Sequence, residues 1–232
     1  MIFIRLSYFK RIETKTRMTE TYRYSDTQTI ANKYIHSDIN CEDTSNTSNT
    51  SNSNSGYLEL IIGPMYAGKS TELLRIINRY KCLNKKICVI NHTFNNRYGS
   101  TGLTTHNRTT FEQCLIVAKL AELDNEILDT DVIIIEELQF FQDAFEYVVK
   151  WCDSGKIIIC AGLDGDYLRN PFGDVLRLIP HADKVTKLNS LCKKCGDGTL
   201  AHFTKRIILS VETTLVGSDE TYEAVCRRHY LE

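Results

Sequence analysis

Short apolar runs alternate with longer segments of helical character from residue 57 onward. The runs at 58–62, 85–90, 131–137 and 156–163 have the length and composition of buried strands. Segments 70–80, 111–128 and 141–151 are predicted as helices, the last ended by Gly155. Strands that alternate with helices favour an α/β fold with right-handed crossovers and a doubly wound, mainly parallel sheet. Ligands of such sheets bind beyond the carboxyl ends of the strands.

Residues 1–55 lack this periodicity and end in a run of Thr, Ser and Asn over 43–55. Such a composition buries too little apolar surface to offset chain entropy, so we expect a disordered, low-complexity extension. A targeting or partner-binding segment is the competing interpretation. Arg5, Lys10 and Arg11 interrupt or closely follow the first apolar residues, so no signal peptide is predicted. No later run reaches membrane-spanning length, and we expect a soluble, intracellular protein.

The first predicted strand leads into a Gly-x-x-x-x-Gly-Lys-Ser loop, which begins at Gly63. Gly63 and Gly68 allow successive backbone N–H groups to turn toward an anion, and the following helix adds its positive N-terminal end. Lys69 is expected to reach the β- and γ-phosphates, and Ser70 to offer its hydroxyl to Mg²⁺. An ordinary glycine turn is the alternative. The loop between strand and helix predicts a P-loop NTPase-like fold.

Two acids, Glu136 and Glu137, end the apolar run 131–137. A carboxylate at the end of such a strand holds Mg²⁺ beside the nucleotide in phosphate-loop enzymes. Adjacent acids point in different directions, so one can face the metal while the other faces a substrate hydroxyl. Alternatively, both cap the next helix. Arg97, in the polar loop 95–102, either contacts phosphate or is simply solvated.

The chain carries 28 Lys and Arg against 29 Asp and Glu, a net charge of −1, and this balance gives no reason to expect a nucleic-acid or membrane surface. Its 9 cysteines favour reduced thiols over a disulfide framework. Two pairs, Cys192 with Cys195 and Cys226 with His229, have zinc-ligand spacing. Four protein ligands leave no open position, so such a zinc is structural. With so many cysteines, a chance spacing stays open.

Residues 164–173 follow the last predicted strand and contain Tyr167, Arg169 and Phe172. They form either an aromatic pocket wall or part of the core.

Five motifs, in this order, resemble the type II (cellular and poxviral type) thymidine kinases over about residues 57–230. They are Gly63-Pro-Met-Tyr-Ala-Gly-Lys-Ser-Thr-Glu72, Glu137-Leu-Gln-Phe-Phe141, Leu163-Asp-Gly-Asp-Tyr-Leu-Arg-Asn-Pro-Phe-Gly173, Thr204-Lys-Arg206 and the two zinc-ligand pairs. The resemblance implies transfer of the γ-phosphoryl group of ATP to the 5′-hydroxyl of thymidine, with deoxyuridine as a second substrate. It also implies Mg²⁺, structural Zn²⁺ and a homotetramer. Together with the lack of a predicted signal it favours a cytoplasmic location, and from the charge balance we expect no nucleic-acid or membrane partner.

The resemblance also implies roles by motif position. Glu137 takes the place of the general base. The nucleotide and its metal are expected at Gly63, Pro64, Met65, Tyr66, Ala67, Gly68, Lys69, Ser70, Arg97, Glu136 and Gln139. The nucleoside is expected at Met65, Leu163, Tyr167, Phe172, Thr204 and Tyr222, and along Thr213, Thr214, Leu215, Val216 and Gly217. The last five belong to a loop, the lasso (about 212–222), which the zinc subdomain tethers. We expect a kinase domain over 56–188 and a zinc-binding lasso subdomain over 189–232.

Four positions depart from the family pattern. Glu136 stands where Asp is common, which puts the metal position in doubt, and Asn95 stands where an Asp usually precedes the loop arginine. Tyr167 replaces a more usual Phe, and its hydroxyl needs a partner if it is buried. His229 in place of a fourth Cys is an accepted variant that preserves zinc.

Two rival functions remain. A kinase for deoxycytidine or a nucleoside monophosphate shares the phosphate machinery, although the zinc-tethered lasso argues against it. A non-enzyme rival is an ATP-switched zinc-ribbon protein that binds nucleic acid. Lys193, Lys194, Arg227 and Arg228 supply the charge for it, but little of the required aromatic interleaving is present.

Overall fold

The computed structural model describes residues 55–95, 103–104, 110–111, 114–209 and 220–232. The chain divides into two units, Met1–Thr50 and Ser51–Glu232, and every described residue belongs to the second. The expected extension over 1–55 therefore lies, except for Ser55, outside the described residues. The loop 95–102, except for Asn95, also lies outside them.

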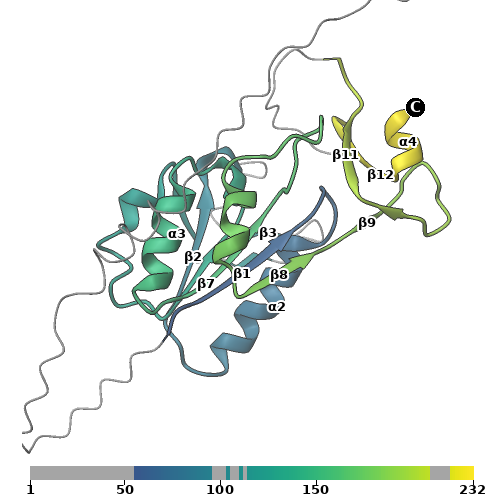
Figure 1. Ribbon diagram of the computed structural model, residues 1–232. Coiled ribbons are helices and arrows are strands. Elements are labelled where there is room, and N and C mark those ends of the chain that lie inside the picture. The colour runs from purple at the N-terminus through teal and green to yellow at the C-terminus, as the bar shows by residue number, and fades with distance from the viewer. Residues whose placement is uncertain (1–54, 96–102, 105–109, 112–113, 210–219) are drawn as a thin grey trace, which may run out of the picture. The chain divides into compact units, whose positions relative to one another are not determined.

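A six-stranded sheet forms the centre of the second unit (Figure 1). Its strands are β1 (Tyr57–Ile62), β2 (Ile87–His92), β5 (Cys114–Val117), β6 (Val132–Ile135), β7 (Ile157–Gly162) and β8 (Lys184–Lys187). They lie in the order β5-β2-β6-β7-β1-β8, and each neighbouring pair is parallel. The carboxyl ends of β1, β6 and β7 therefore meet at one edge of the sheet, where the predicted ligand-binding segments follow them.

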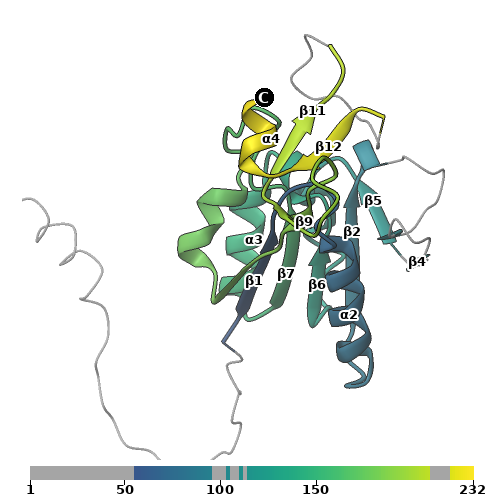
Figure 2. The same ribbon diagram turned by 90° about the vertical axis from the view of Figure 1, so that its right-hand side faces the viewer.

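The two faces of this sheet bury different residues because successive side chains of a strand point to opposite sides. Leu58, Leu60 and Ile62 of β1 pack with α3 (Ala144–Asp153) and the 3₁₀ segment η4 (Val175–His181). Ile61 instead packs with α2 (Lys69–Lys81). Figure 1 shows α2 and α3 on opposite sides of the strands, and Figure 2 shows α2 in front of the sheet. This covering explains why the central strands are nearly continuous apolar runs.

The chain beyond β8 forms a smaller part with short antiparallel pairs. Its elements are β9 (Ser190–Leu191), β10 (Leu200–Ala201), β11 (Phe203–Arg206), β12 (Tyr222–Val225) and α4 (Arg227–Leu231). β9 pairs with β10, and β11 pairs with β12. The remaining short elements are η1 (Thr93–Asn95), β3 (Leu103–Thr104), β4 (Thr110–Phe111), η2 (Leu120–Leu123) and η3 (Leu138–Phe140). In the part of the chain that the structure describes, no helix is long and apolar enough to cross a membrane.

The fold class predicted from the sequence is confirmed, and one element is wrong. The helix predicted over 111–128 is replaced by the strand β5 and the short segment η2. Cys114 to Val117 pair with Val89 to His92 and so gain a ladder of hydrogen bonds that local helix propensity could not reveal. The edge strand β8 was not predicted, because its sequence Lys-Val-Thr-Lys carries one large apolar side chain.

Candidate active site and metal centre

The phosphate loop lies between the end of β1 and the start of α2, as predicted. Gly63 has a φ of 145° and Gly68 a φ of 82°, conformations that residues with a Cβ rarely adopt. A Cβ on Gly63 would lie 2.3 Å from the carbonyl oxygen of Leu188, so the segment after β8 passes directly against the loop. The Lys69 ammonium donates to the Pro64 carbonyl at 2.8 Å and links the two ends of the loop.

The first of the two acids lies against this loop. The Ser70 hydroxyl donates to Oε1 of Glu136 at 2.8 Å. Glu136 is 3% exposed, and its Oε2 is buried with no hydrogen-bond partner among the described residues. Burial, followed by the charge of Glu137, holds the pKa of Glu136 well above its usual range, although the Ser70 hydrogen bond and Lys69 oppose this. A buried carboxylate oxygen without a partner, next to a loop hydroxyl, is a suitable ligand for a hard cation.

The second acid, Glu137, lies immediately before η3 in a left-handed conformation, with a φ of 55°. Non-glycine residues held in this region concentrate at functional sites. The side-chain amide of Gln139 donates to Oε2 of Glu137 at 2.5 Å, and its Oε1 accepts the N–H of Leu163 at 3.0 Å. Gln139 is 4% exposed. The carboxylate of Glu137 is therefore fixed through Gln139 to the end of β7.

Aromatic side chains from three different segments contact one another at η3, the segment that follows Glu137. Phe172 meets Phe140 edge to face, with ring centroids 5.7 Å apart, and Phe140 in turn contacts His92. Burial lowers the pKa of His92, which favours the neutral ring. Sequence reasoning did not single out Phe140 or His92. Their positions in the sequence could have indicated them, since each lies at or just beyond the carboxyl end of a strand.

The loop after β7 is joined to the C-terminal part by a stack of rings and arginines. The Arg206 guanidinium lies 3.8 Å from the ring centroid of Tyr167, and its Nη2 donates to the Tyr222 hydroxyl at 2.9 Å. Tyr230 donates from its hydroxyl to the Tyr167 carbonyl at 2.9 Å. The structure thus brings together Tyr167 and Tyr222, two of the residues expected at the nucleoside.

The remaining expected contacts divide into two groups. Met65 and Thr204 meet, since the Met65 N–H donates to Oγ1 of Thr204 at 3.0 Å. Other expected residues lie outside the described part of the chain, together with most of the lasso. They are Arg97, Thr213, Thr214, Leu215, Val216 and Gly217.

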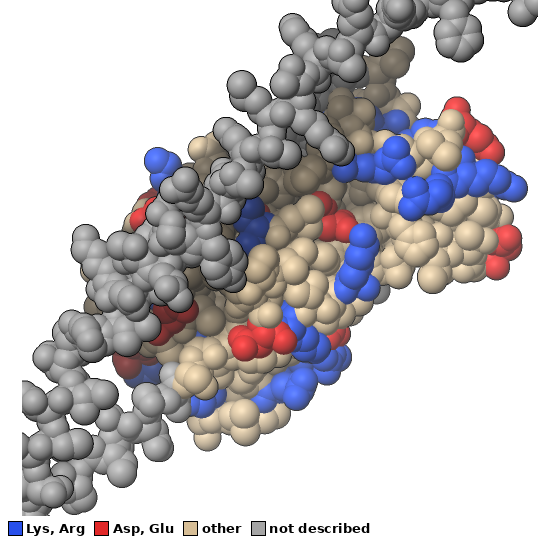
Figure 3. Space-filling view, viewed as in Figure 1, with Lys and Arg blue, Asp and Glu red and all other residues tan. Residues whose placement is uncertain are grey.

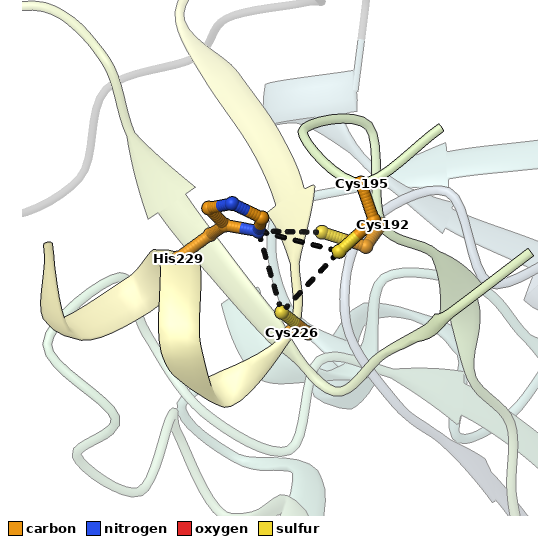
Figure 4. A group of neighbouring side chains, drawn as sticks. All are labelled: Cys192, Cys195, Cys226 and His229. Carbon is orange, nitrogen blue, oxygen red and sulfur yellow. Dashed lines mark hydrogen bonds between the residues drawn. The ribbon is translucent and has the colours of Figure 1, made fainter. Parts of the chain in front are cut away.

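The four predicted zinc ligands converge (Figure 4), and their ligand atoms all lie within 4.8 Å of one another. Nδ1 of His229 lies 3.4 to 3.5 Å from the three sulfurs, and the Cys195 and Cys226 sulfurs are 3.8 Å apart. Sulfurs around a tetrahedral zinc, with Zn–S bonds of about 2.3 Å, are separated by about 3.8 Å. Cys192 and Cys195 come from the turn after β9, whereas Cys226 and His229 bracket the start of α4. The donor set and its spacing fit zinc.

Together, a phosphate loop after β1, a serine hydroxyl on a buried carboxylate and a second acid beside it define a phosphate-loop phosphotransferase of the α/β class, with a Cys₃His centre. Comparisons with known proteins specify the family. A family model described as thymidine kinase matches residues 56–230. The chain belongs to the thymidine kinase family.

Curated relatives agree with this assignment. Thymidine kinases of vaccinia virus (strain Western Reserve) and of monkeypox virus are each 42% identical over 179 residues, which cover 77% of this chain and 99% of the relative. A thymidine kinase of variola virus has the same identity and coverage. Among solved structures, the flagellar accessory protein FlaH of Methanocaldococcus jannaschii aligns with a TM-score of 0.39 and 14% identity, covering 68% of this chain and 75% of that chain, too weak a likeness to support an argument.

Proposed function

We propose that this enzyme transfers the γ-phosphoryl group of ATP to the 5′-hydroxyl of thymidine, and of deoxyuridine as a second acceptor. One observation carries the proposal. The hydroxyl of the phosphate-loop residue Ser70 touches Glu136, and the next residue, Glu137, is fixed separately by Gln139. The two acids therefore have different surroundings, which suits one for the cation of the nucleotide and the other for the nucleoside hydroxyl.

The phosphates of ATP would lie in the loop formed by Gly63, Pro64, Met65, Tyr66, Ala67, Gly68, Lys69 and Ser70. The Ser70 hydroxyl and the buried Glu136 carboxylate fit a magnesium ion, because Oε2 of Glu136 has no protein partner in the described residues. When bound, the ion neutralises charge on the β- and γ-phosphates. Glu136 in place of the family's Asp keeps this charge on a side chain one methylene longer. Lys69 would leave the Pro64 carbonyl for phosphate oxygens.

Glu137 is proposed as the general base. Its carboxylate would accept the proton of the 5′-hydroxyl as that oxygen attacks the γ-phosphorus in line. The side-chain amide of Gln139 donates to the Glu137 carboxylate, so we propose that Gln139 contributes to the nucleotide site through Glu137. Arg206 and Arg97 are the candidates for stabilising charge on the transferred group.

The thymine base and the sugar are proposed to contact Met65, Leu163, Tyr167, Phe172, Thr204 and Tyr222, with Thr213, Thr214, Leu215, Val216 and Gly217 of the lasso along the base. Phe172 and Tyr167 are half-buried and belong to the loop that follows Leu163, and Phe172 contacts Phe140, three residues after the proposed base Glu137. Flat rings beside a catalytic carboxylate suit a planar pyrimidine.

Structural zinc at Cys192, Cys195, Cys226 and His229 would tie the ends of the C-terminal part together. We propose a kinase domain over 56–188 and a zinc-binding lasso subdomain over 189–232. The homotetrameric state, the cytoplasmic location and the absence of nucleic-acid and membrane partners are further parts of the proposal, supported by the family resemblance.

The surface charges give little support to the nucleic-acid-binding rival. Of its basic residues, Lys194 is paired with Glu223, and Arg228 lies 3.7 Å from Glu232. Arg227 lies over the ring of Phe203. Figure 3 shows Lys and Arg side chains gathered over the C-terminal part, with acidic side chains at the edges of this group. Neighbouring acids weaken the positively charged track that a strand of nucleic acid requires.

A product assay tests the proposal. Purified full-length protein is incubated with Mg-ATP labelled at the γ-phosphate and with thymidine, deoxyuridine, deoxycytidine or thymidine monophosphate. We expect labelled monophosphate mainly from thymidine, then from deoxyuridine. Transfer mainly to deoxycytidine or to the monophosphate would replace the acceptor. Hydrolysis of ATP that DNA stimulates, without transfer to a nucleoside, would favour the zinc-ribbon rival.

A further inference from the structure

Two side chains join the phosphate loop directly to the part of the chain that carries the zinc ligands. Tyr66 of the loop packs against the small cluster formed by Cys192, Ala201, Ala224 and Val225. Thr204 of β11 accepts the N–H of Met65. We propose that Tyr66 and Thr204 are positioning residues that couple the order of the Cys₃His centre to the shape of the phosphate loop, so that zinc and nucleotide bind cooperatively. This inference rests on the proposed function.

The backbone of Tyr66 carries the first part of the argument. Its φ is 63°, a left-handed conformation that costs a residue with a Cβ about 1 to 2 kcal/mol. Surrounding contacts must stabilise such a conformation. Here the aromatic ring lies in the cluster beside the zinc ligand Cys192, and its hydroxyl donates to the Tyr222 carbonyl at 3.4 Å. The conformation of the loop therefore depends on a neighbour that belongs to the zinc-binding part.

The hydrogen bond from Met65 to Thr204 carries the second part. Thr204 is 6% exposed, and the bond to its hydroxyl is buried. The Met65 N–H therefore points toward β11. If Thr204 no longer accepts this hydrogen bond, the buried Met65 N–H is left without a partner, at a cost of about 1 to 3 kcal/mol. Loss of the hydrogen bond therefore favours a rearranged loop.

A short path leads from these two residues to all four ligands. Thr204 pairs with Ala224 across β11 and β12, and β12 ends immediately before Cys226. Lys193, next to Cys192, donates its N–H to the Ala224 carbonyl at 3.1 Å. Both ligand pairs are therefore linked through Ala224, which pairs with Thr204 and belongs to the cluster against which Tyr66 packs. Loss of the metal would loosen this junction and with it the loop.

Coupling of this kind is reciprocal, which gives a test that does not require stable metal-free protein. Zinc-loaded full-length protein is mixed with an excess of a chromogenic chelator, with and without Mg-ATP and in the absence of thymidine. We expect Mg-ATP to slow zinc release about fivefold in the parent protein and to have no effect in Tyr66→Gly. Glycine keeps the left-handed backbone accessible and removes the ring. Equal release rates in the parent with and without nucleotide would overturn the coupling.

Thr204→Val and Thr204→Ser form a matched pair for the second contact. Valine removes the acceptor of Met65 at nearly constant volume, whereas serine retains the hydroxyl. We expect valine to weaken Mg-ATP binding about fivefold and to speed amide exchange at Met65 about tenfold, with serine within about twofold of the parent. Mg-ATP affinity within twofold of the parent in both Thr204→Val and Tyr66→Gly, with zinc retained, would overturn the positioning roles.

The proposed function fails in a different way. If the parent protein binds zinc and ATP yet phosphorylates no nucleoside, the acceptor is wrong and the coupling can still hold. If it binds both and phosphorylates thymidine while zinc release ignores the nucleotide, the coupling alone is wrong.

Discussion

Gln139 holds the carboxylate of Glu137 from one side, with its amide nitrogen 2.5 Å from Oε2. The other end of the same amide accepts the N–H of Leu163, the first residue beyond β7. A single buried side chain therefore fixes the proposed base relative to a second strand. The left-handed backbone of Glu137 is a strained conformation of the kind that concentrates at functional sites.

Replacement of Gln139 by alanine should therefore lower kcat by about 10- to 100-fold, since small misplacements of a reacting group are costly. The KM for ATP should change about twofold or less, because the phosphate loop is untouched. Steady-state kinetics with ATP and thymidine varied separately measures both constants. An increased KM for ATP with unchanged kcat would instead place Gln139 at the nucleotide.

The two glycines of the phosphate loop should respond differently to an added methyl group. In Gly63→Ala the Cβ meets the Leu188 carbonyl at 2.3 Å, and backbone must move. In Gly68→Ala it meets nothing within 4 Å, and only the left-handed backbone is penalised. We expect the melting temperature of the ligand-free protein to fall by roughly 10 °C for Gly63→Ala and by roughly 3 °C for Gly68→Ala. Equal decreases would show that the contact with Leu188 does not constrain the loop.

The buried Glu136 should make the ligand-free protein less stable as the pH rises. Because its pKa is raised in the folded state, the unfolded chain ionises first, and stability is lost from about pH 4.5 upward until the folded-state pKa is passed. Glu136→Gln removes this loss. We expect its melting temperature to exceed that of the parent by about 3 to 6 °C at pH 8, and to match it at pH 4. A difference in melting temperature between the variant and the parent that stays the same from pH 4 to pH 8 would contradict the raised pKa.

Removal of one zinc ligand should loosen the C-terminal part. Cys226→Ser should bind zinc at least about tenfold more weakly and lower the melting temperature by roughly 10 °C or more, because structural zinc contributes directly to folding. Cys82→Ser is the control, since Cys82 is an exposed thiol on the distant end of α2. A chromogenic chelator measures the zinc content of both variants, and calorimetry measures their melting temperatures. Unchanged zinc content in Cys226→Ser would reject the ligand set.

Much of the fold could be predicted because its central strands are buried on both faces. β1, β6 and β7 are apolar throughout or nearly so, and each lies where the sequence predicts a strand. Prediction failed at the sheet edges. β5 is held by its pairing with β2, and no local pattern distinguishes Cys114 to Val117 from a helix segment. The polar strand β8 depends in the same way on β1.

The site, too, could be predicted from the sequence only in part. Contacts within a motif, such as the loop glycines and the zinc-ligand spacing, are visible in the chain because the chemistry fixes the spacing. Contacts between motifs are not. Thr204 lies 139 positions from its partner Met65, and the sequence near either residue does not predict the hydrogen bond. The link between Gln139 and Glu137 is short, but it depends on a left-handed backbone that the sequence does not reveal.

The central claim is that the adjacent acids have different roles, Glu136 at the metal of the nucleotide and Glu137 as the general base. One pair of variants tests it. Single-turnover phosphoryl transfer and Mg-ATP affinity are measured for Glu137→Gln and Glu136→Gln. We predict that Glu137→Gln slows transfer by about 10²- to 10⁴-fold while Mg-ATP affinity stays within about twofold. Glu136→Gln should weaken Mg-ATP binding about tenfold or more. Near-normal transfer by Glu137→Gln, or the same losses in both variants, would contradict the assignment.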